Sequence, residues 1–146
     1  MVEYTCSGYK ETMSNRAFIQ FKHEKDKELY FMLHPILQKI LASMALYCHT
    51  HSMPFVITST VSTLEEDQRI NRVSSTHREA RAADISVRGW DAFESADFVK
   101  LFNKEYGKYG AISKATGKSK LVYMHVGTAP HLHIQIHKKY KVDMSH

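Results

Sequence analysis

Histidines in two short segments, together with one aspartate, are the residues of this chain best suited to metal chemistry. The first segment carries His77 and Asp84, and the second begins at Pro130 and carries His131 and His133. Two histidines and one carboxylate that leave a fourth tetrahedral position open are a typical donor set of catalytic zinc sites. The two segments therefore predict a metal centre, provided that the fold brings them together.

The spacing of His77 and Asp84 restricts the backbone between them. On one helix these two residues would be about 10 Å apart along the axis, too far to share a metal with bonds of about 2 Å. On one continuous strand their side chains would point to opposite faces. We therefore expect the chain to bend over residues 78–81 and to enter a strand over residues 82–87 that carries Asp84.

The second segment alternates between polar and apolar residues, as a strand with one buried face does. The polar face of a strand over residues 131–137 would carry His131, His133, Gln135 and His137. The opposite face, packed against the core, would carry Leu132, Ile134 and Ile136. Same-face neighbours are about 6–7 Å apart, so one histidine can bind a metal while the next acts on a water bound to it. A solvent-facing strand would show the same alternation, so the metal prediction also depends on the upstream segment.

Two longer stretches have the apolar spacing of amphipathic helices. Apolar residues recur every three or four positions over residues 25–47, where Pro35 interrupts the pattern, and again over residues 90–106. Met32 in the first stretch and Phe93 in the second are expected to face the core. Both helices should therefore pack on the sheet that carries the histidines.

The other elements are shorter and point to one fold class. A third helix is expected to begin after an N-cap at Ser62 or Thr63 and to end near Val73. Residues 107–118 look like a basic loop region. Strands are expected over residues 16–21, 54–60, 82–87, 121–126 and 131–137. This order predicts an α+β domain with a small, mainly antiparallel sheet and flanking helices.

Composition and charge limit the class of protein. The chain has 146 residues, of which 43% are hydrophobic and 24% charged, as is usual for one globular domain. We expect a single domain over residues 1–146, with its motif-bearing core over about residues 54–137. The net charge of +5 suits an anionic partner, which could be nucleic acid, a membrane surface or a cell-wall polymer.

The cysteines and the apolar runs bear on localisation. Cys6 and Cys48 have no close spacing, which favours a reduced, cytoplasmic site of synthesis. The first residues do not form a basic region followed by an apolar core, so no signal peptide is expected. No apolar run approaches the roughly 18 residues of a transmembrane helix. Action at the cell wall would therefore require release by another component.

Both histidine-bearing segments resemble the signature of the zinc D-alanyl-D-alanine carboxypeptidases and the related L-alanyl-D-glutamate endopeptidases, which share the hedgehog/DD-peptidase fold. That signature is Ser-x-His-x-x-Gly-x-Ala-x-Asp, followed downstream by a zinc histidine that some relatives carry within His-x-His. It is matched here by Ser75, His77, Ala82 and Asp84, and then by His131 and His133. The resemblance covers about residues 54–137, and the two motifs are specific when they occur in this order.

The resemblance implies a metallopeptidase similar to a phage endolysin. It implies one Zn²⁺ per chain, held by His77, Asp84 and His133 with a water in the fourth position, and a peptidoglycan peptide as substrate. It implies His131 as the catalytic residue, because some relatives use the first histidine of His-x-His. Arg81 and Ser75 are the candidates for substrate binding. The carboxylate-binding arginine could also be Arg69, Arg72 or Arg88, and Ser75 could instead brace its loop.

The chain departs from the signature at three places. Ala80 replaces the glycine, a modest change if the backbone there is not left-handed. The arginine that many relatives carry after the preceding strand is missing from residues 59–63. Pro130 occupies the position where many relatives have an acid as general base. These departures keep a second interpretation open, namely a zinc-binding domain without peptidase activity.

A further alternative comes from a different class of enzyme. The segment from His131 to Ile136 also resembles the histidine-triad nucleotide-binding pattern, in which one histidine attacks a nucleotide phosphorus. That interpretation leaves His77 and Asp84 without a role. We therefore favour a zinc peptidase over a nucleotide hydrolase or transferase, and a peptidoglycan peptide over nucleic acid as the partner.

Overall fold

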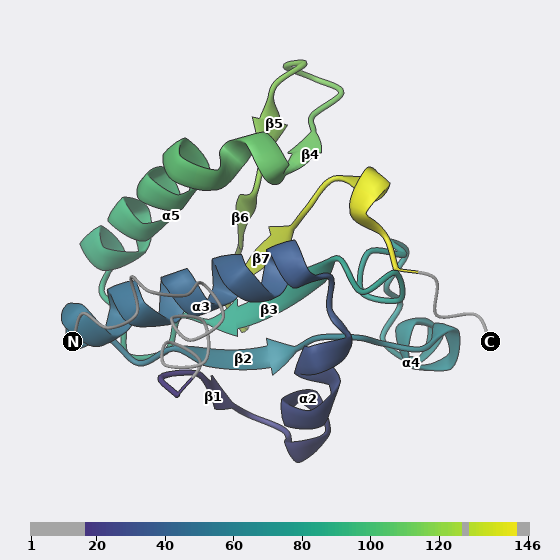
Figure 1. Ribbon diagram of the computed structural model, residues 1–146, viewed down its shortest axis with the longest axis horizontal. Coiled ribbons are helices and arrows are strands. Elements are labelled where there is room, and N and C mark those ends of the chain that lie inside the picture. The colour runs from purple at the N-terminus through teal and green to yellow at the C-terminus, as the bar shows by residue number, and fades with distance from the viewer. Residues whose placement is uncertain (1–16, 127–128, 143–146) are drawn as a thin grey trace.

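The protein is an α+β structure, as the sequence predicts. The computed structural model describes residues 17–126 and 129–142 (Figure 1). Its α-helices are α2 (Glu24–Leu29), α3 (Pro35–Thr50), α4 (Leu64–Arg69) and α5 (Ala92–Tyr106), and its short 3₁₀ helices are η2 (Tyr30–Met32), η3 (Gly107–Tyr109) and η4 (Lys138–Tyr140). Its strands are β1 (Gln20–Phe21), β2 (Val56–Ser59), β3 (Ala82–Ser86), β4 (Ala111–Ile112), β5 (Ser119–Lys120), β6 (Val122–His125) and β7 (His131–Gln135). Cys6, the segment searched for a signal peptide and the start of the strand expected at residue 16 lie outside the described residues.

The main sheet places the two histidine-bearing segments side by side. Its strand order is β1-β2-β3-β7-β6, in which β1 runs parallel to β2 and the other neighbouring pairs are antiparallel. Asp84 of β3 lies opposite His133 of β7, and Ser86 lies opposite His131. The mainly antiparallel sheet predicted from the sequence is therefore confirmed, and its register brings together the segments that the metal prediction requires.

One face of the sheet is buried beneath helices. Helices α3 and α5 lie over the same face (Figure 1). Ile85, Leu132 and Ile134 are fully buried on that face, together with Leu37 and Phe98 from the helices. Burying each such side chain contributes about 1.5–3 kcal/mol. Burial of Leu132 and Ile134 in the core therefore determines which face of β7 is covered by helices, and His131 and His133 lie on the opposite face.

Capping residues set where the helices begin. The predicted break at Pro35 is confirmed, because Pro35 occupies the first turn of α3. Thr63 forms a capping box with Glu66 at the start of α4, as expected for one of the two candidate N-caps. The predicted end of that helix near Val73 is wrong, because α4 ends at Arg69. Val73 is 94% exposed, so no apolar burial supports a further turn.

Three other sequence expectations are corrected. Met32 and Phe93 do not fill the core, since they are 45% and 83% exposed. The region expected to be a basic loop contains η3 and the β4–β5 hairpin. After β7 the chain forms η4 and is tied back by a hydrogen bond from the Val142 backbone N–H to the Glu79 carbonyl.

Helix α5 also contacts the start of β6 through one polar side chain. The Asn103 Oδ1 accepts hydrogen bonds from the backbone N–H groups of Leu121 and Val122, and its Nδ2 donates to the Val122 carbonyl. The side-chain amide thus pairs with backbone groups as a neighbouring strand would.

Among the described residues, no helix is both long enough and apolar enough to cross a bilayer.

Candidate metal centre

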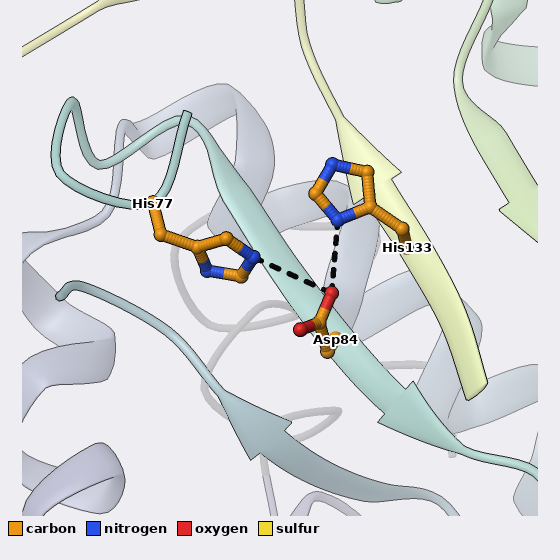
Figure 2. Close-up of side chains that lie close together, drawn as sticks. All are labelled: His77, Asp84 and His133. Atoms are coloured by element: carbon orange, nitrogen blue, oxygen red, sulfur yellow. Dashed lines mark hydrogen bonds and ion pairs between the residues drawn. The ribbon is translucent and has the colours of Figure 1, made fainter. Parts of the chain in front are cut away.

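His77, Asp84 and His133 converge on one point, as the two sequence segments predict. His77 comes from the turn before β3, Asp84 from β3 and His133 from β7 (Figure 2). The Asp84 Oδ1 lies 2.9 Å from the His133 Nδ1 and 3.4 Å from the His77 Nε2. Donor atoms on a tetrahedral zinc are about 3.3 Å apart, given bonds of about 2.0–2.1 Å. One donor atom from each residue lies within 4.8 Å of the others, so the group could hold a metal ion.

The bend expected between His77 and Asp84 is a tight helical turn that ends at Ala80. The Arg81 N–H donates to the Thr76 carbonyl, and the Ala80 N–H donates to the His77 carbonyl. These two bonds form a Schellman motif, in which the residue at the position of Ala80 is left-handed and usually glycine. Ala80 has a φ of 57° and is fully buried. The replacement of the signature glycine is therefore not the modest change expected for an ordinary backbone conformation.

Each of the two histidines has one ring nitrogen engaged away from the proposed metal position. The Nδ1 of His77 lies 2.7 Å from the Thr60 carbonyl oxygen, and the Nε2 of His133 lies 2.9 Å from the Gln135 Oε1. Both oxygens are acceptors, so each of these nitrogens must donate its proton. The other nitrogen of each ring faces Asp84, where it donates a hydrogen bond when it carries a proton and presents a lone pair to a metal when it does not. Such outer hydrogen bonds orient histidine ligands in metal sites.

Asp84 is a buried carboxylate held in its ionised form. Burial opposes its ionisation, but hydrogen bonds from His133 and His77 and their charges outweigh burial and hold the pKa of Asp84 well below its usual range. The other carboxylate oxygen, Oδ2, lies 3.5 Å from the Nη2 of Arg72. An anionic oxygen donor is therefore ready at the centre of the group.

Arg72 is itself held by the buried carboxylate of Asp67. The Arg72 Nη1 lies 3.0 Å from the Asp67 Oδ1, while Arg78 contacts the other oxygen at 2.7 Å and Ser62 donates to Oδ1 at 2.7 Å. The Asp67 side chain is 0% exposed. This network joins helix α4 to the turn that carries His77, because the Ser62 N–H also donates to the His77 carbonyl.

His131, the predicted catalytic residue, lies at the edge of the group. Its Nε2 is 4.0 Å from the Asp84 Oδ1, and its Nδ1 is 3.2 Å from the Ala129 carbonyl oxygen. With Nδ1 donating to that carbonyl, Nε2 carries the free lone pair. The ring of His125, the cross-strand partner on β6, stacks on it with centroids 5.1 Å apart. His131 is thus positioned to accept a proton beside the three donors.

The two residues predicted to bind substrate are both bonded to Glu79 and not to the metal ligands. The Arg81 Nε donates to the Glu79 Oε1 at 2.6 Å, and the Ser75 hydroxyl donates to the Glu79 Oε2 at 3.1 Å. Arg81 also donates to the Ile136 carbonyl. Within the described residues, neither side chain forms a hydrogen bond or ion pair with His77, Asp84 or His133. Their substrate-binding role stays a prediction, and these contacts brace the turn.

Three side chains at the site were not singled out from the sequence. Arg72 was one of four candidate arginines, and only the buried Asp67 reveals which of them reaches Asp84. Gln135 was placed beside His133 on the polar face of β7 by alternation, but its role in orienting the His133 ring was not predicted. His125 could be recognised as a neighbour of the site only from the pairing of β6 with β7, which places it opposite His131.

Comparison with known proteins adds no family assignment. No protein-family model, curated protein or solved structure matches the chain. The function must therefore be argued from the residues of the site and the resemblance of its motifs.

Proposed function

We propose that this protein is a zinc metallopeptidase that hydrolyses peptide bonds in peptidoglycan stem peptides. The observation that carries the proposal is the convergence of His77, Asp84 and His133, with both histidine rings oriented by outer hydrogen bonds. Two histidines, one carboxylate and an open fourth position suit catalytic zinc better than structural zinc, which is usually fully ligated by protein. The resemblance of both motifs to zinc peptidases of the cell wall supplies the class of substrate.

The side chains around the group have separable roles in such a reaction. A bound zinc ion supplies Lewis acidity, which polarises a carbonyl and lowers the pKa of a coordinated water towards about 7. His131, through its Nε2, would take the proton of the attacking water and deliver it to the departing amine. Arg72 would keep Asp84 oriented and add positive charge close to the metal ligands. Asp67 would hold Arg72 in place.

A zinc-binding domain without peptidase activity is the second candidate. Pro130, which stands where many relatives of the resembled family carry an acid, favours it. In this case the three donors would bind zinc while His131 would have no catalytic effect. The two candidates share the metal site and differ only in turnover.

Digestion of purified peptidoglycan, with mass spectrometry of the released muropeptides, tests the proposal. We expect the zinc-loaded protein to release new amino termini, and a chelator to abolish the release. His133→Ala should lose both zinc and activity. His131→Ala should keep one zinc per chain and lose activity by about 10²–10⁴-fold, the usual contribution of a general acid–base residue.

His23→Ala is the matched control, because His23 is an exposed histidine outside the metal group. It should keep both zinc and activity. Full zinc loading of the unmodified protein without any release of amines would rule out the peptidase and favour the non-catalytic candidate. Failure to bind zinc at all would rule out both.

A further inference from the structure

The positive charge of the chain is concentrated in one stretch. Residues 106–142 contain seven lysines and no aspartate or glutamate. The remainder of the chain holds thirteen of the twenty Lys and Arg residues and all fifteen Asp and Glu residues, so it is slightly acidic. The excess charge of this basic protein therefore comes from the stretch that includes η3, the β4–β5 hairpin and η4.

Part of this stretch encloses a pocket away from the metal ligands. The pocket has a volume of about 230 Å³ and lies between η3, the β4–β5 hairpin and the end of β7. It is lined by Lys108, Gly110, Ile112, Gly117, Ser119, His137 and Lys139. The pocket contains several times the roughly 30 Å³ that a water molecule occupies in the liquid, so it has room for a small hydrated group.

Backbone contacts hold the walls of the pocket together. Gly110 forms a bridge to Ile136, and the His137 N–H donates to the Tyr109 carbonyl at 2.8 Å. A Cβ atom at Gly110 would lie 2.2 Å from the Lys120 carbonyl oxygen, so only glycine permits this close approach. The pocket is therefore built by the backbone and does not depend on the flexible lysine side chains alone.

Four of the side chains that line the pocket can donate hydrogen bonds. The Nδ1 of His137 accepts a hydrogen bond from the Lys139 N–H at 3.1 Å, so the proton of the neutral ring resides on Nε2. The Lys108 and Lys139 ammonium groups lie over the rings of Tyr109 and Tyr140, each 5.2 Å from the ring centre. Within the described part of the chain, neither lysine forms an ion pair. Two ammonium groups, an imidazole N–H and the Ser119 hydroxyl thus belong to residues that line one pocket, and each can donate to an anion.

We propose that this pocket binds a phosphate group of a polyanionic polymer that has no nucleobases. Lysine ammonium groups bind phosphate as point charges, and residues 106–142 contain no acid that would compete for them. Tyr109 and Tyr140 are only partly exposed and lie beneath lysines, so the pocket offers no open aromatic platform for stacked bases. The inference that this polymer is part of the cell wall that carries the peptide substrate rests on the proposed function. The inference that the pocket binds phosphate does not.

The test combines mapping with a charge-matched variant. NMR titration of the protein with inorganic phosphate should shift the signals of Lys108, Ser119, His137 and Lys139. In a binding assay with poly(glycerol phosphate), Lys108→Ala/Lys139→Ala should weaken binding by tenfold or more. The control Lys27→Ala/Lys100→Ala removes the same charge from exposed lysines outside the stretch and should change binding less than twofold.

Each other outcome overturns the proposal. Equal losses in the two double variants would show that net charge alone attracts the polymer. Tighter binding to a single-stranded DNA oligonucleotide or to phosphatidylglycerol vesicles than to poly(glycerol phosphate) would assign the pocket to another partner. The same assay on His133→Ala should give unchanged binding, so a failure of the peptidase proposal and a failure of this one are told apart.

Discussion

The metal group on β7 and the pocket beyond the end of that strand use positive charge in opposite ways. Near His133, the guanidinium groups of Arg72 and Arg78 are bound to the carboxylates of Asp67 and Asp84. Beyond His137, lysines line a pocket in a stretch of sequence without any acid. At the metal group, the arginine charges are paired with carboxylates and hold the metal ligands in position. In the pocket, the lysine charges remain available to an external anion. This difference predicts that mutations at the metal group lower stability more than mutations in the pocket.

The largest effect is expected at Asp67. Asp67→Asn removes the buried charge that binds the partly exposed Arg72 and Arg78, and we expect a loss of about 1.5–3 kcal/mol in the free energy of unfolding. Lys139→Ala in the basic pocket should change the free energy of unfolding by no more than about 0.5 kcal/mol. Urea denaturation of both variants measures the comparison. Equal, small losses would mean that the arginines do not depend on Asp67.

The same carboxylate should give stability a dependence on acid pH. Burial opposes ionisation of Asp67, but hydrogen bonds from Ser62, Arg72 and Arg78 outweigh it and lower the pKa. A lowered pKa in the folded state stabilises the protein above the unfolded value of about 3.9, and this contribution is lost as pH falls towards the folded pKa. Denaturation of Asp67→Asn below pH 4 should therefore show a shallower loss of stability than the unmodified protein.

An intermediate effect is expected at Gln135. Gln135→Leu removes the acceptor that orients the His133 ring, and such outer contacts typically account for 10–100-fold in metal affinity. Competition titration with a zinc indicator measures the change. Gln135→Glu keeps an acceptor and should retain affinity, and Gln20→Leu on exposed β1 should have no effect. Unchanged affinity in Gln135→Leu would show that the core alone orients His133.

The smallest effect concerns the left-handed turn that carries His77. Ala83→Gly, in β3, should cost about 1–2 kcal/mol, from a lost methyl group and added backbone freedom. Ala80→Gly loses the same methyl but relieves a left-handed conformation that costs an alanine about 1–2 kcal/mol. Its free energy of unfolding should therefore stay near that of the unmodified protein. Equal costs at the two buried alanines, measured in urea, would contradict strain at Ala80.

Much of the ligand arrangement could be predicted because it depends on local periodicity. Alternation along β7 is enforced by burial of Leu132 and Ile134, and the spacing of His77 and Asp84 permits convergence only through a bend. The structure has both features. Zinc binding and catalysis themselves stay predictions, as do the single domain and the role of His131.

The remaining features depend on contacts that no local pattern encodes. Which arginine reaches Asp84 is decided by Asp67, a helix residue whose acidic side chain looks solvent-facing in the sequence. The β4–β5 hairpin has only two residues in each strand, too few for alternation to be recognised. The basic pocket forms only when η4 returns beside η3, so the sequence shows its charge but not its enclosure.

Asn103 has a consequence for how this protein behaves at high concentration. β6 is an outer strand of the described sheet, and exposed backbone groups on an outer strand can recruit a strand from another molecule. The Asn103 amide occupies three of these groups at Leu121 and Val122. One side chain of α5 thereby occupies backbone groups at the start of this edge that a strand from another molecule would need.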